Sequence, residues 1–193
     1  MEVKKYKPKF NESLPYNDYK PHYCIMKQKV SELDLTILKP QRAGVILYTK
    51  INNVFYFGLG VDEATKEYTD FGGGISYKLG YDKNVIDGAL REFNEETLNI
   101  FGFLSYYDVQ DCLALYNTNI LVIFKYVNQN IDVIKNRFLE TYNHYIESGY
   151  KPEVCDIVWL TQNEFKNQIM VRDNLFHRLQ CFLQKAGQFF WLL

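Results

Sequence analysis

The sequence predicts an α/β protein, built as an α/β/α or α+β sandwich. Runs rich in β-branched and aromatic residues, typical of strands, occur at 43–48, 54–61, 112–116, 119–126 and 157–160. Apolar residues at helical spacing occur at 84–98, 132–147 and 175–183. Strands and helices that share one chain in this way pack as layers around a common core.

The length and composition fit one globular domain. The chain has 193 residues, of which 47% are hydrophobic and 23% charged, so it can bury a core without disulfides or metals. It has no long apolar run, and no membrane span is expected. The basic N-terminus MEVKKYKPKF has no apolar segment behind it, which argues against a secretory signal and favours a cytoplasmic protein.

The cysteines and the net charge exclude further classes of site. Cys24, Cys112, Cys155 and Cys181 form no short CxxC pair, which argues against a zinc site and against a disulfide framework. We therefore expect reduced, buried thiols. The net charge of −1 gives no general attraction to nucleic acid.

Residues 1–40 differ from the rest of the chain. They are rich in proline and tyrosine and contain one short apolar stretch at 23–30. We expect an irregular N-terminal extension that packs on a domain formed by residues 41–193. Lysines at positions 4, 5, 7, 9 and 20 form a cluster that is more often a solvated arm than a binding site.

The first strands and the first helix surround a glycine-rich segment. Residues 43–48 and 54–61 are separated by Ile51-Asn52-Asn53, which predicts a hairpin. The following Phe71-Gly72-Gly73-Gly74 is expected to be a loop. It leads toward an amphipathic helix at 84–98.

The next segment predicts a second hairpin and a helix. Asn117-Thr118 is expected to be the turn between strands 112–116 and 119–126. The helix at 132–147, ended by Gly149, is expected to be an insertion near 132–148.

The C-terminal segment predicts a strand and two helices. The strand 157–160 runs into Thr161-Gln162-Asn163-Glu164, a capping box that opens a helix. Asp173 is expected to cap the last helix, which ends near Gly187.

Three carboxylates on the helix 84–98 carry the chemistry. Glu92, Glu95 and Glu96 stand at i, i+3 and i+4, where side chains are neighbours and like charges cost about 0.2–0.5 kcal/mol per pair. A hard divalent cation such as Mg²⁺ uses oxygen ligands of this kind. Alone, such a cluster is more often a solvated acidic face. The glycine-rich segment upstream and Arg91 directly before Glu92 favour a metal site.

In this context the sequence resembles the Nudix hydrolase family. REFNEET with an upstream GGG is similar to the second half of the Nudix box, whose core reads R-E-apolar-x-E-E, and the matching residues are Arg91, Glu92, Phe93, Glu95 and Glu96. The resemblance implies an α/β/α sandwich with a mixed sheet. It also implies a Mg²⁺-dependent hydrolase, with Mn²⁺ as a substitute, that cleaves the diphosphate linkage of a nucleoside diphosphate attached to another group.

The first half of the box departs from the family pattern. Lys83 stands at the position of the family's first glutamate, with Asp82 beside it, and the spacing from Gly74 is longer by three residues. Phe71 replaces a frequent proline, and Asn99 stands near a frequent glycine. These departures keep open the alternative of a catalytically inactive Nudix domain that binds nucleotide, RNA or another protein.

The resemblance also implies roles for single residues. Glu92, Glu95 and Glu96 would hold the metal, with a backbone carbonyl of Gly73 or Gly74 completing its ligands. Arg91 would brace a carboxylate or the loop, and its alternative is a plain surface ion pair.

Two carboxylates are candidates for the general base. Glu92 is the first and Glu153 the second, because Nudix proteins often place an additional acidic ligand just before a late strand. Taken alone, Glu153 is more often a solvent-exposed loop residue.

The substrate is the least specified part of the prediction. GALREFNEETLNIFG also resembles Nudix proteins of large DNA viruses, some of which remove the mRNA cap, so capped RNA in a host cytoplasm is one candidate partner. Free nucleotides, dinucleoside polyphosphates and sugar nucleotides are the others. A purely structural acidic helix is a third reading, in which Glu96→Gln would leave stability unchanged or improved and affect nothing else.

Overall fold

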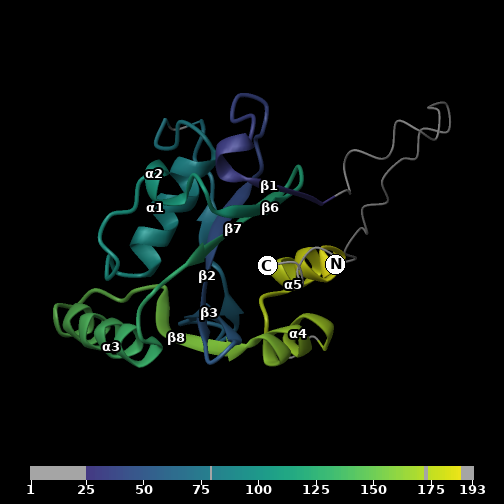
Figure 1. Ribbon diagram of the computed structural model, residues 1–193. Coiled ribbons are helices and arrows are strands. Elements are labelled where there is room, and N and C mark those ends of the chain that lie inside the picture. The colour runs from purple at the N-terminus through teal and green to yellow at the C-terminus, as the bar shows by residue number, and fades with distance from the viewer. Residues whose placement is uncertain (1–24, 79, 172–173, 188–193) are drawn as a thin grey trace, which may run out of the picture.

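A single mixed sheet with helices on both faces forms the centre of the protein (Figure 1). The computed structural model describes residues 25–78, 80–171 and 174–187. The helices α1, α2 and α3 cover one face of the sheet, and α4 and α5 cover the other. The predicted α/β sandwich with a mixed sheet is therefore confirmed.

Within the described residues, the sheet has eight strands in the order β1-β6-β7-β2-β3-β4, with β5 paired to β2 and β8 paired to β3. Only the pair of β2 and β7 is parallel among the described strands, and the other pairs are antiparallel. The strands are β1 (Met26–Lys29), β2 (Arg42–Ile51), β3 (Val54–Asp62), β4 (Tyr68–Thr69), β5 (Phe71–Gly74), β6 (Leu113–Tyr116), β7 (Ile120–Tyr126) and β8 (Val154–Thr161).

The helices begin close to the predicted residues where a side chain caps them. Asn84 accepts hydrogen bonds from the first turn of α1, and the Thr161–Glu164 capping box opens α4 as predicted. No helix in the described part of the chain has both the length and the apolar character that a membrane crossing requires. The helices are η2 (Val30–Glu32, a 3₁₀ turn), α1 (Val85–Glu96), α2 (Tyr106–Val109), α3 (Ile131–Glu147), α4 (Gln162–Met170) and α5 (His177–Lys185).

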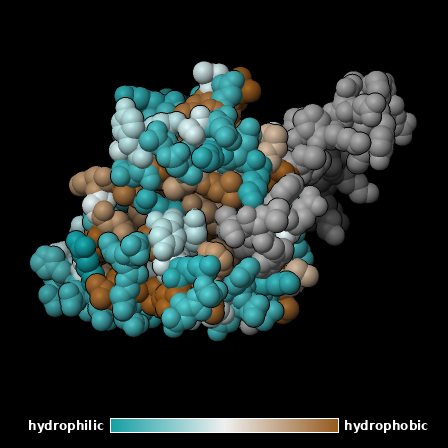
Figure 2. Space-filling view, viewed as in Figure 1, coloured by the Kyte–Doolittle hydropathy of each residue, from teal (hydrophilic) through white to brown (hydrophobic). Residues whose placement is uncertain are grey.

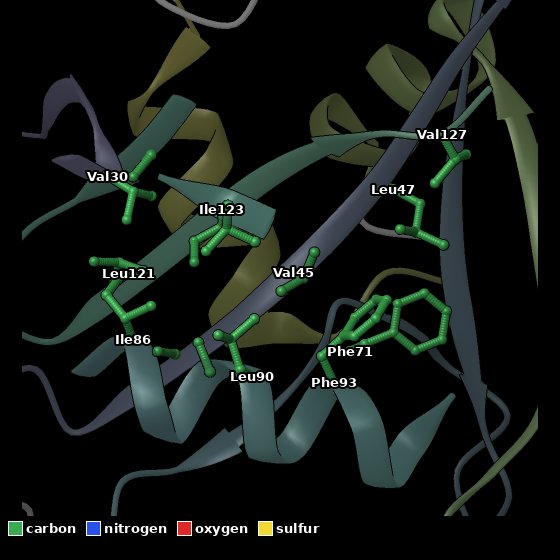
Figure 3. Close-up of a cluster of buried hydrophobic side chains, with 14 of the residues drawn as sticks. Val30, Val45, Leu47, Phe71, Ile86, Leu90, Phe93, Leu121, Ile123 and Val127 are labelled. Carbon is green, nitrogen blue, oxygen red and sulfur yellow. The ribbon is translucent and has the colours of Figure 1, made fainter. Parts of the chain in front are cut away.

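Alternation along the central strands divides the core into two clusters. In β2, Val45 and Leu47 pack toward α1, whereas Ile46 between them packs toward α4 and α5. Figure 3 shows the first cluster, in which Leu90 and Phe93 of α1 point at the sheet.

The space-filling view shows mainly hydrophilic residues on the face in view, with hydrophobic residues in smaller patches between them (Figure 2).

The β2–β3 hairpin is confirmed, and its turn explains its sequence. Asn52 and Asn53 have φ angles of 49° and 64°. Such a two-residue turn with both residues at positive φ is favoured by the twist of the strands, and asparagine tolerates it better than most residues. The second hairpin, β6–β7, is also confirmed, with Asn117 in its turn.

The prediction of a loop at Phe71–Gly74 is wrong, because these residues form strand β5. β2 pairs with β3 through residues 47–51 and with β5 through residues 42–45, so β5 lies in a fork between β2 and β3. A Cβ atom on Gly72 would clash with Gly44 and lie 2.5 Å from the carbonyl oxygen of Ala43. The glycines therefore permit close strand packing.

The described part of the N-terminal segment is less irregular than predicted. Residues 26–29 form β1, which pairs with β6, and Val30 is fully buried. Residues 1–24 lie outside the described part, so the division into extension and domain stays a prediction. The short elements β4 and α2 carried no sequence signal that we recognised.

Two smaller predictions also change. The last helix begins at His177 after Phe176, whereas its predicted cap, Asp173, lies outside the described residues. Cys112, Cys155 and Cys181 are free, as expected, but half-buried instead of buried. Cys24 is outside the described part of the chain.

Candidate active site

The helix α1 places its carboxylates at the edge of its buried face. Asn84 accepts hydrogen bonds from the N–H groups of Ile86 and Asp87 at 2.8 and 3.0 Å, which fixes where the helix starts. One helical face then packs on the sheet, and the carboxylates follow along its border. Glu92, Glu95 and Glu96 line one hollow of about 60 Å³ together with Tyr150, Pro152 and Glu153.

Glu96 is the most deeply placed of these carboxylates. Its Oε2 accepts a hydrogen bond of 2.7 Å from the N–H of Gly72 in β5. Burial raises the pKa of Glu96 well above its ordinary value, and the nearby Asp70 raises it further. Deprotonated Glu96 is therefore costly unless a cation approaches it.

Glu92 is half-buried beside the glycine strand. Burial raises the pKa of Glu92, although the charge of Arg91 partly offsets the effect. Arg91 Nη1 lies 2.8 Å from Glu92 Oε1. A Cβ atom on Gly73 would lie 2.5 Å from the carboxyl carbon of Glu92, so the absence of a side chain there lets the carboxylate lie against the strand.

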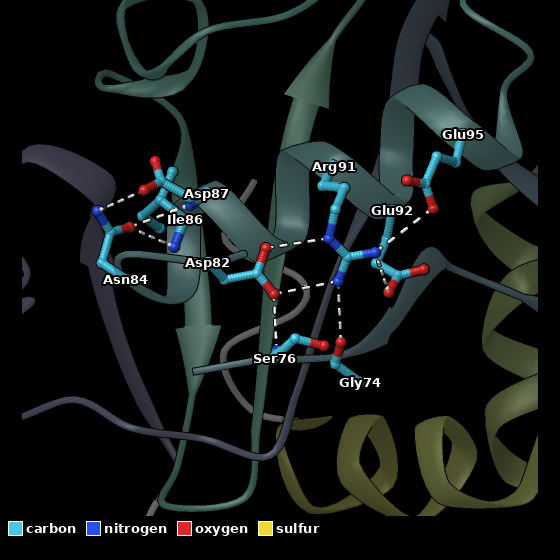
Figure 4. Close-up of polar contacts among 9 residues, drawn as sticks. All are labelled: Gly74, Ser76, Asp82, Asn84, Ile86, Asp87, Arg91, Glu92 and Glu95. Atoms are coloured by element: carbon cyan, nitrogen blue, oxygen red, sulfur yellow. Dashed lines mark hydrogen bonds and ion pairs between the residues drawn. The ribbon is translucent and has the colours of Figure 1, made fainter. Parts of the chain in front are cut away.

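Arg91 connects α1 to the segment that follows β5 (Figure 4). Its Nε and Nη2 donate to the two carboxylate oxygens of Asp82 at 3.0 and 3.1 Å, and Nη2 also donates to the carbonyl of Gly74 at 3.1 Å. Asp82 also accepts a 2.7 Å hydrogen bond from the N–H of Ser76. This network braces both the glycine strand and the long loop.

Asp82, and not Lys83, forms the ion pair that joins the loop after β5 to Arg91 of α1. Asp82 is buried whereas Lys83 is exposed. Burial raises the pKa of Asp82, but the hydrogen bonds from Arg91 and Ser76 outweigh it and leave the pKa lowered. The carboxylate is thus ionised and holds the loop against α1.

Glu95 and Glu153 are the exposed members of the group. The Glu95 side chain is 62% exposed and lies 3.4 Å from Arg91. Glu153 precedes β8, where its carbonyl accepts a 2.7 Å hydrogen bond from the N–H of Glu63. The fold thus brings Glu153 to the helix carboxylates, from which it is distant in sequence.

Sequence reasoning missed a buried ion pair beneath Glu96. Arg42 Nη1 and Asp70 Oδ2 are 2.7 Å apart, and their side chains are only 14% and 0% exposed. Arg42 also donates to the carbonyl of Gly72 at 2.8 Å. Burial lowers the pKa of Arg42, but the charge and hydrogen bond of Asp70, together with the nearby carboxylates of Glu96 and Glu92, outweigh burial and leave the pKa raised. The available signal was an arginine directly before the apolar run at 43–48.

A second hollow of about 240 Å³ adjoins the first, because Glu96 and Glu153 line both. Arg42 and Phe176 stand in its wall, with the Arg42 guanidinium 5.5 Å from the centre of the Phe176 ring. The other residues that line it are Asp62, Thr65, Glu67, Thr69 and Gly72.

The donor set fits a hard divalent cation, with one restriction. Among the described residues, no group of three or more His, Cys, Asp or Glu side chains is arranged to hold a metal ion. Mg²⁺, however, keeps several waters and is usually held by one or two carboxylates together with substrate phosphates. Two half-buried or buried carboxylates with raised pKa values, Glu92 and Glu96, match that requirement.

No protein-family model and no curated protein sequence matches the chain. A crystal structure of an Ap4A hydrolase from C. elegans is 18% identical, with a TM-score of 0.42, and covers 77% of this chain and 96% of that one. A binary complex of a C. elegans Ap4A hydrolase is 15% identical, with a TM-score of 0.43 and coverages of 80% and 100%.

The NUDIX domain of NrtR from Shewanella oneidensis, solved with ADP ribose, is 12% identical, with a TM-score of 0.42 and coverages of 82% and 94%. TM-scores of this size assign neither an activity nor a residue role to the chain.

Proposed function

We propose that the chain is a Nudix-type, Mg²⁺-dependent hydrolase that cleaves the diphosphate linkage of a nucleoside diphosphate joined to another group. One observation carries the proposal. Glu92 and Glu96 share a hollow with Glu153, and burial raises the pKa of both helix carboxylates. Carboxyl groups whose pKa is raised by burial, lying in a concave site, are typical of functional positions.

Glu92 and Glu96 would hold the cation, with Glu95 or Glu153 contacting it directly or through water. The backbone carbonyl of Gly73 is a further candidate ligand, since the Gly74 carbonyl already accepts from Arg91. When bound, Mg²⁺ or Mn²⁺ would polarise the phosphoryl group and lower the pKa of the attacking water.

The protein's own groups orient and neutralise the diphosphate. Arg42 is held in place by Asp70 and by the carbonyl of Gly72. A guanidinium fixed beside the carboxylates can hydrogen-bond a phosphate oxygen and offset its charge. Phe176 in the same hollow offers an aromatic surface for a base.

Glu92 is the first candidate for the general base. Its raised pKa brings it closer to the range in which a carboxylate accepts a proton efficiently. Glu153 is the second candidate, because it lines the same hollow and is exposed to solvent. Arg91 acts as a positioning residue, since its contacts reach the loop and the carboxylates.

A non-catalytic nucleotide-binding domain is the second candidate. Arg91 favours this alternative, because it forms ion pairs with Glu92 and Asp82. The lack of a group of three metal ligands among the described residues also favours it. In that case the protein would bind a nucleotide without turning it over.

The test is hydrolysis by the purified protein of a panel of capped RNA, dinucleoside polyphosphates, ADP-ribose and nucleoside triphosphates with Mg²⁺. Glu96→Gln run in parallel excludes contaminating activity. Turnover of one class by the wild type alone supports the proposal and identifies the substrate, with cap removal one of the outcomes. Binding without turnover by either protein would favour the binding domain.

A further inference from the structure

A third and larger hollow lies on the other side of Arg42. Its volume is about 690 Å³, and it extends from the start of β2 to the β6–β7 turn and α5. Arg42 lines both this hollow and the 240 Å³ hollow beside the carboxylates. The two hollows therefore meet at Arg42. We call the larger one the α5 groove.

The charge of the lining changes sign at Arg42. The α5 groove contains His177, Arg178 and Lys185 of α5, and none of the described residues that line it is an aspartate or a glutamate. The hollow on the other side contains four such residues, Asp62, Glu67, Glu96 and Glu153. Without a metal ion, these carboxylates would repel a phosphate group. The α5 groove would attract a phosphate group even when no metal ion is bound.

The basic side chains of the α5 groove are placed to meet a ligand. His177, Arg178 and Lys185 are exposed. The side chain of Arg178 forms no hydrogen bond or ion pair with any other residue in the described part of the chain. Its planar guanidinium can bind a phosphate through two parallel hydrogen bonds. Asn117 and Asn119 of the β6–β7 turn add polar groups to the lining of the groove.

We propose that the α5 groove binds further phosphate groups of the substrate, on the side of the diphosphate away from the carboxylates. The substrate class is thus a nucleoside diphosphate whose second moiety carries additional phosphates, either as a nucleotide chain or as an oligophosphate. The volume of the α5 groove is within the range of a small-molecule site. This inference rests on the proposed function for the position of the scissile bond, but binding in the groove needs neither metal nor turnover.

The experiment measures binding in EDTA, where hydrolysis cannot occur. The probes are a fluorescein-labelled, 5′-phosphorylated RNA decamer, followed by anisotropy, and sodium tripolyphosphate as a competitor. Arg178→Gln is compared with Arg137→Gln, because Arg137 is likewise an exposed helix arginine but lies on α3, at the opposite face of the sheet.

The proposal predicts that Arg178→Gln weakens RNA binding about tenfold and lowers the salt slope by about 1. Arg137→Gln should bind like the wild type. Competition by tripolyphosphate at similar concentrations would identify a general oligophosphate site, whereas RNA binding that resists it would identify a nucleotide chain. Equal affinities of the wild type, Arg178→Gln and Arg137→Gln for both probes would overturn the proposal.

Glu96→Gln separates this proposal from the function on which it rests. It should bind RNA in EDTA at least as tightly as the wild type, because it removes a carboxylate that repels phosphate and leaves the α5 groove intact, whether or not the wild type hydrolyses any compound. Loss of binding in Glu96→Gln but not in Arg178→Gln would place the phosphates at the carboxylates and contradict the α5 groove.

Discussion

One buried and two half-buried ionisable side chains meet at the fork between β2 and β3. Arg42 pairs with Asp70, and Glu96 accepts a hydrogen bond from Gly72, whose carbonyl Arg42 also binds. The carboxyl groups of Asp70 and Glu96 thus both lie close enough to one guanidinium to feel its charge. An arrangement of this kind stabilises the fold only modestly, because desolvation of the charges offsets their attraction. Its value lies in fixing the position of Arg42 and Glu96.

Removing one partner of this ion pair should be far more costly than removing a surface partner. Asp70→Asn leaves the Arg42 charge buried and unpaired, and we expect the free energy of unfolding to fall by about 3 kcal/mol. Asp111→Asn is the matched control, because Asp111 is 82% exposed and lies 3.9 Å from Lys29. Its loss should stay below about 1 kcal/mol. Urea denaturation measures both, and equal losses would contradict a buried, structurally important pair.

At the scale of elements, the glycine strand β5 decides the geometry of the site. It pairs with β2 and contacts α1, where the N–H of Gly72 donates to Glu96 and the carbonyl of Gly74 accepts from Arg91. The strand can approach both neighbours only because side chains are absent where they would collide. Each glycine in it therefore has a different tolerance for substitution.

Gly72→Ala and Gly74→Ala form a matched pair of variants. A Cβ atom at Gly72 meets the backbone of β2, whereas one at Gly74 meets nothing within 4 Å. We expect Gly72→Ala to lower the free energy of unfolding by about 3 kcal/mol or more, and Gly74→Ala to change it by less than about 1 kcal/mol, in the stabilising direction. Thermal unfolding measures the difference. A Gly72→Ala protein as stable as Gly74→Ala would disprove the close strand packing.

The elements also show what a sequence can and cannot predict. α1 and α4 were predictable because a cap and a 3.6-residue period lie within a few consecutive residues. Phe71–Gly74 was misassigned because its glycines are typical of loops, and only the pairing with β2 shows that they belong to a strand. Local composition cannot reveal a partner that lies some thirty residues away.

The same limit applies to the candidate site. Glu92, Glu95 and Glu96 were identifiable from their spacing on one helix. Arg42 and Asp70 are 28 residues apart in sequence, and neither belongs to a local motif. Asp82 was noted only as the neighbour of Lys83, yet it is the residue that pairs with Arg91. Their roles follow from the register of β2 against β5 and from the path of the loop.

For the whole molecule, the raised pKa values of Glu92 and Glu96 imply a pH-dependent stability. Each carboxyl keeps its proton longer in the folded state than in the unfolded chain, where the pKa is near 4.5. Stability contributed by these groups is therefore greatest at low pH and falls as the pH rises above that value. Asp82 has the opposite effect on stability, because its pKa is lowered in the folded state. Its ionised carboxylate stabilises the fold above about pH 4, and this stabilisation is lost as the pH falls below that value.

We therefore expect thermal stability to be highest near about pH 5 and to decline toward about pH 8. Excess Mg²⁺ should raise the midpoint at the higher pH, by about 2–4 °C for each kcal/mol of binding, and have little effect where the carboxyls are protonated. Glu96→Gln should flatten the decline and abolish most of the Mg²⁺ effect. Identical pH profiles for the wild type and Glu96→Gln would show that Glu96 is not strained by burial.

The most direct test of the account is the rate of diphosphate hydrolysis as a function of Mg²⁺ concentration. The wild type, Glu96→Gln and Glu140→Gln, an exposed glutamate on α3, are compared on the same panel of compounds. We predict that the wild type and Glu140→Gln are inactive in EDTA and reach the same saturating rate with Mg²⁺. Glu96→Gln should be slower by at least about 100-fold at every concentration. Hydrolysis that is independent of Mg²⁺, or a Glu96→Gln rate equal to that of Glu140→Gln, would contradict the metal-dependent role of the α1 carboxylates.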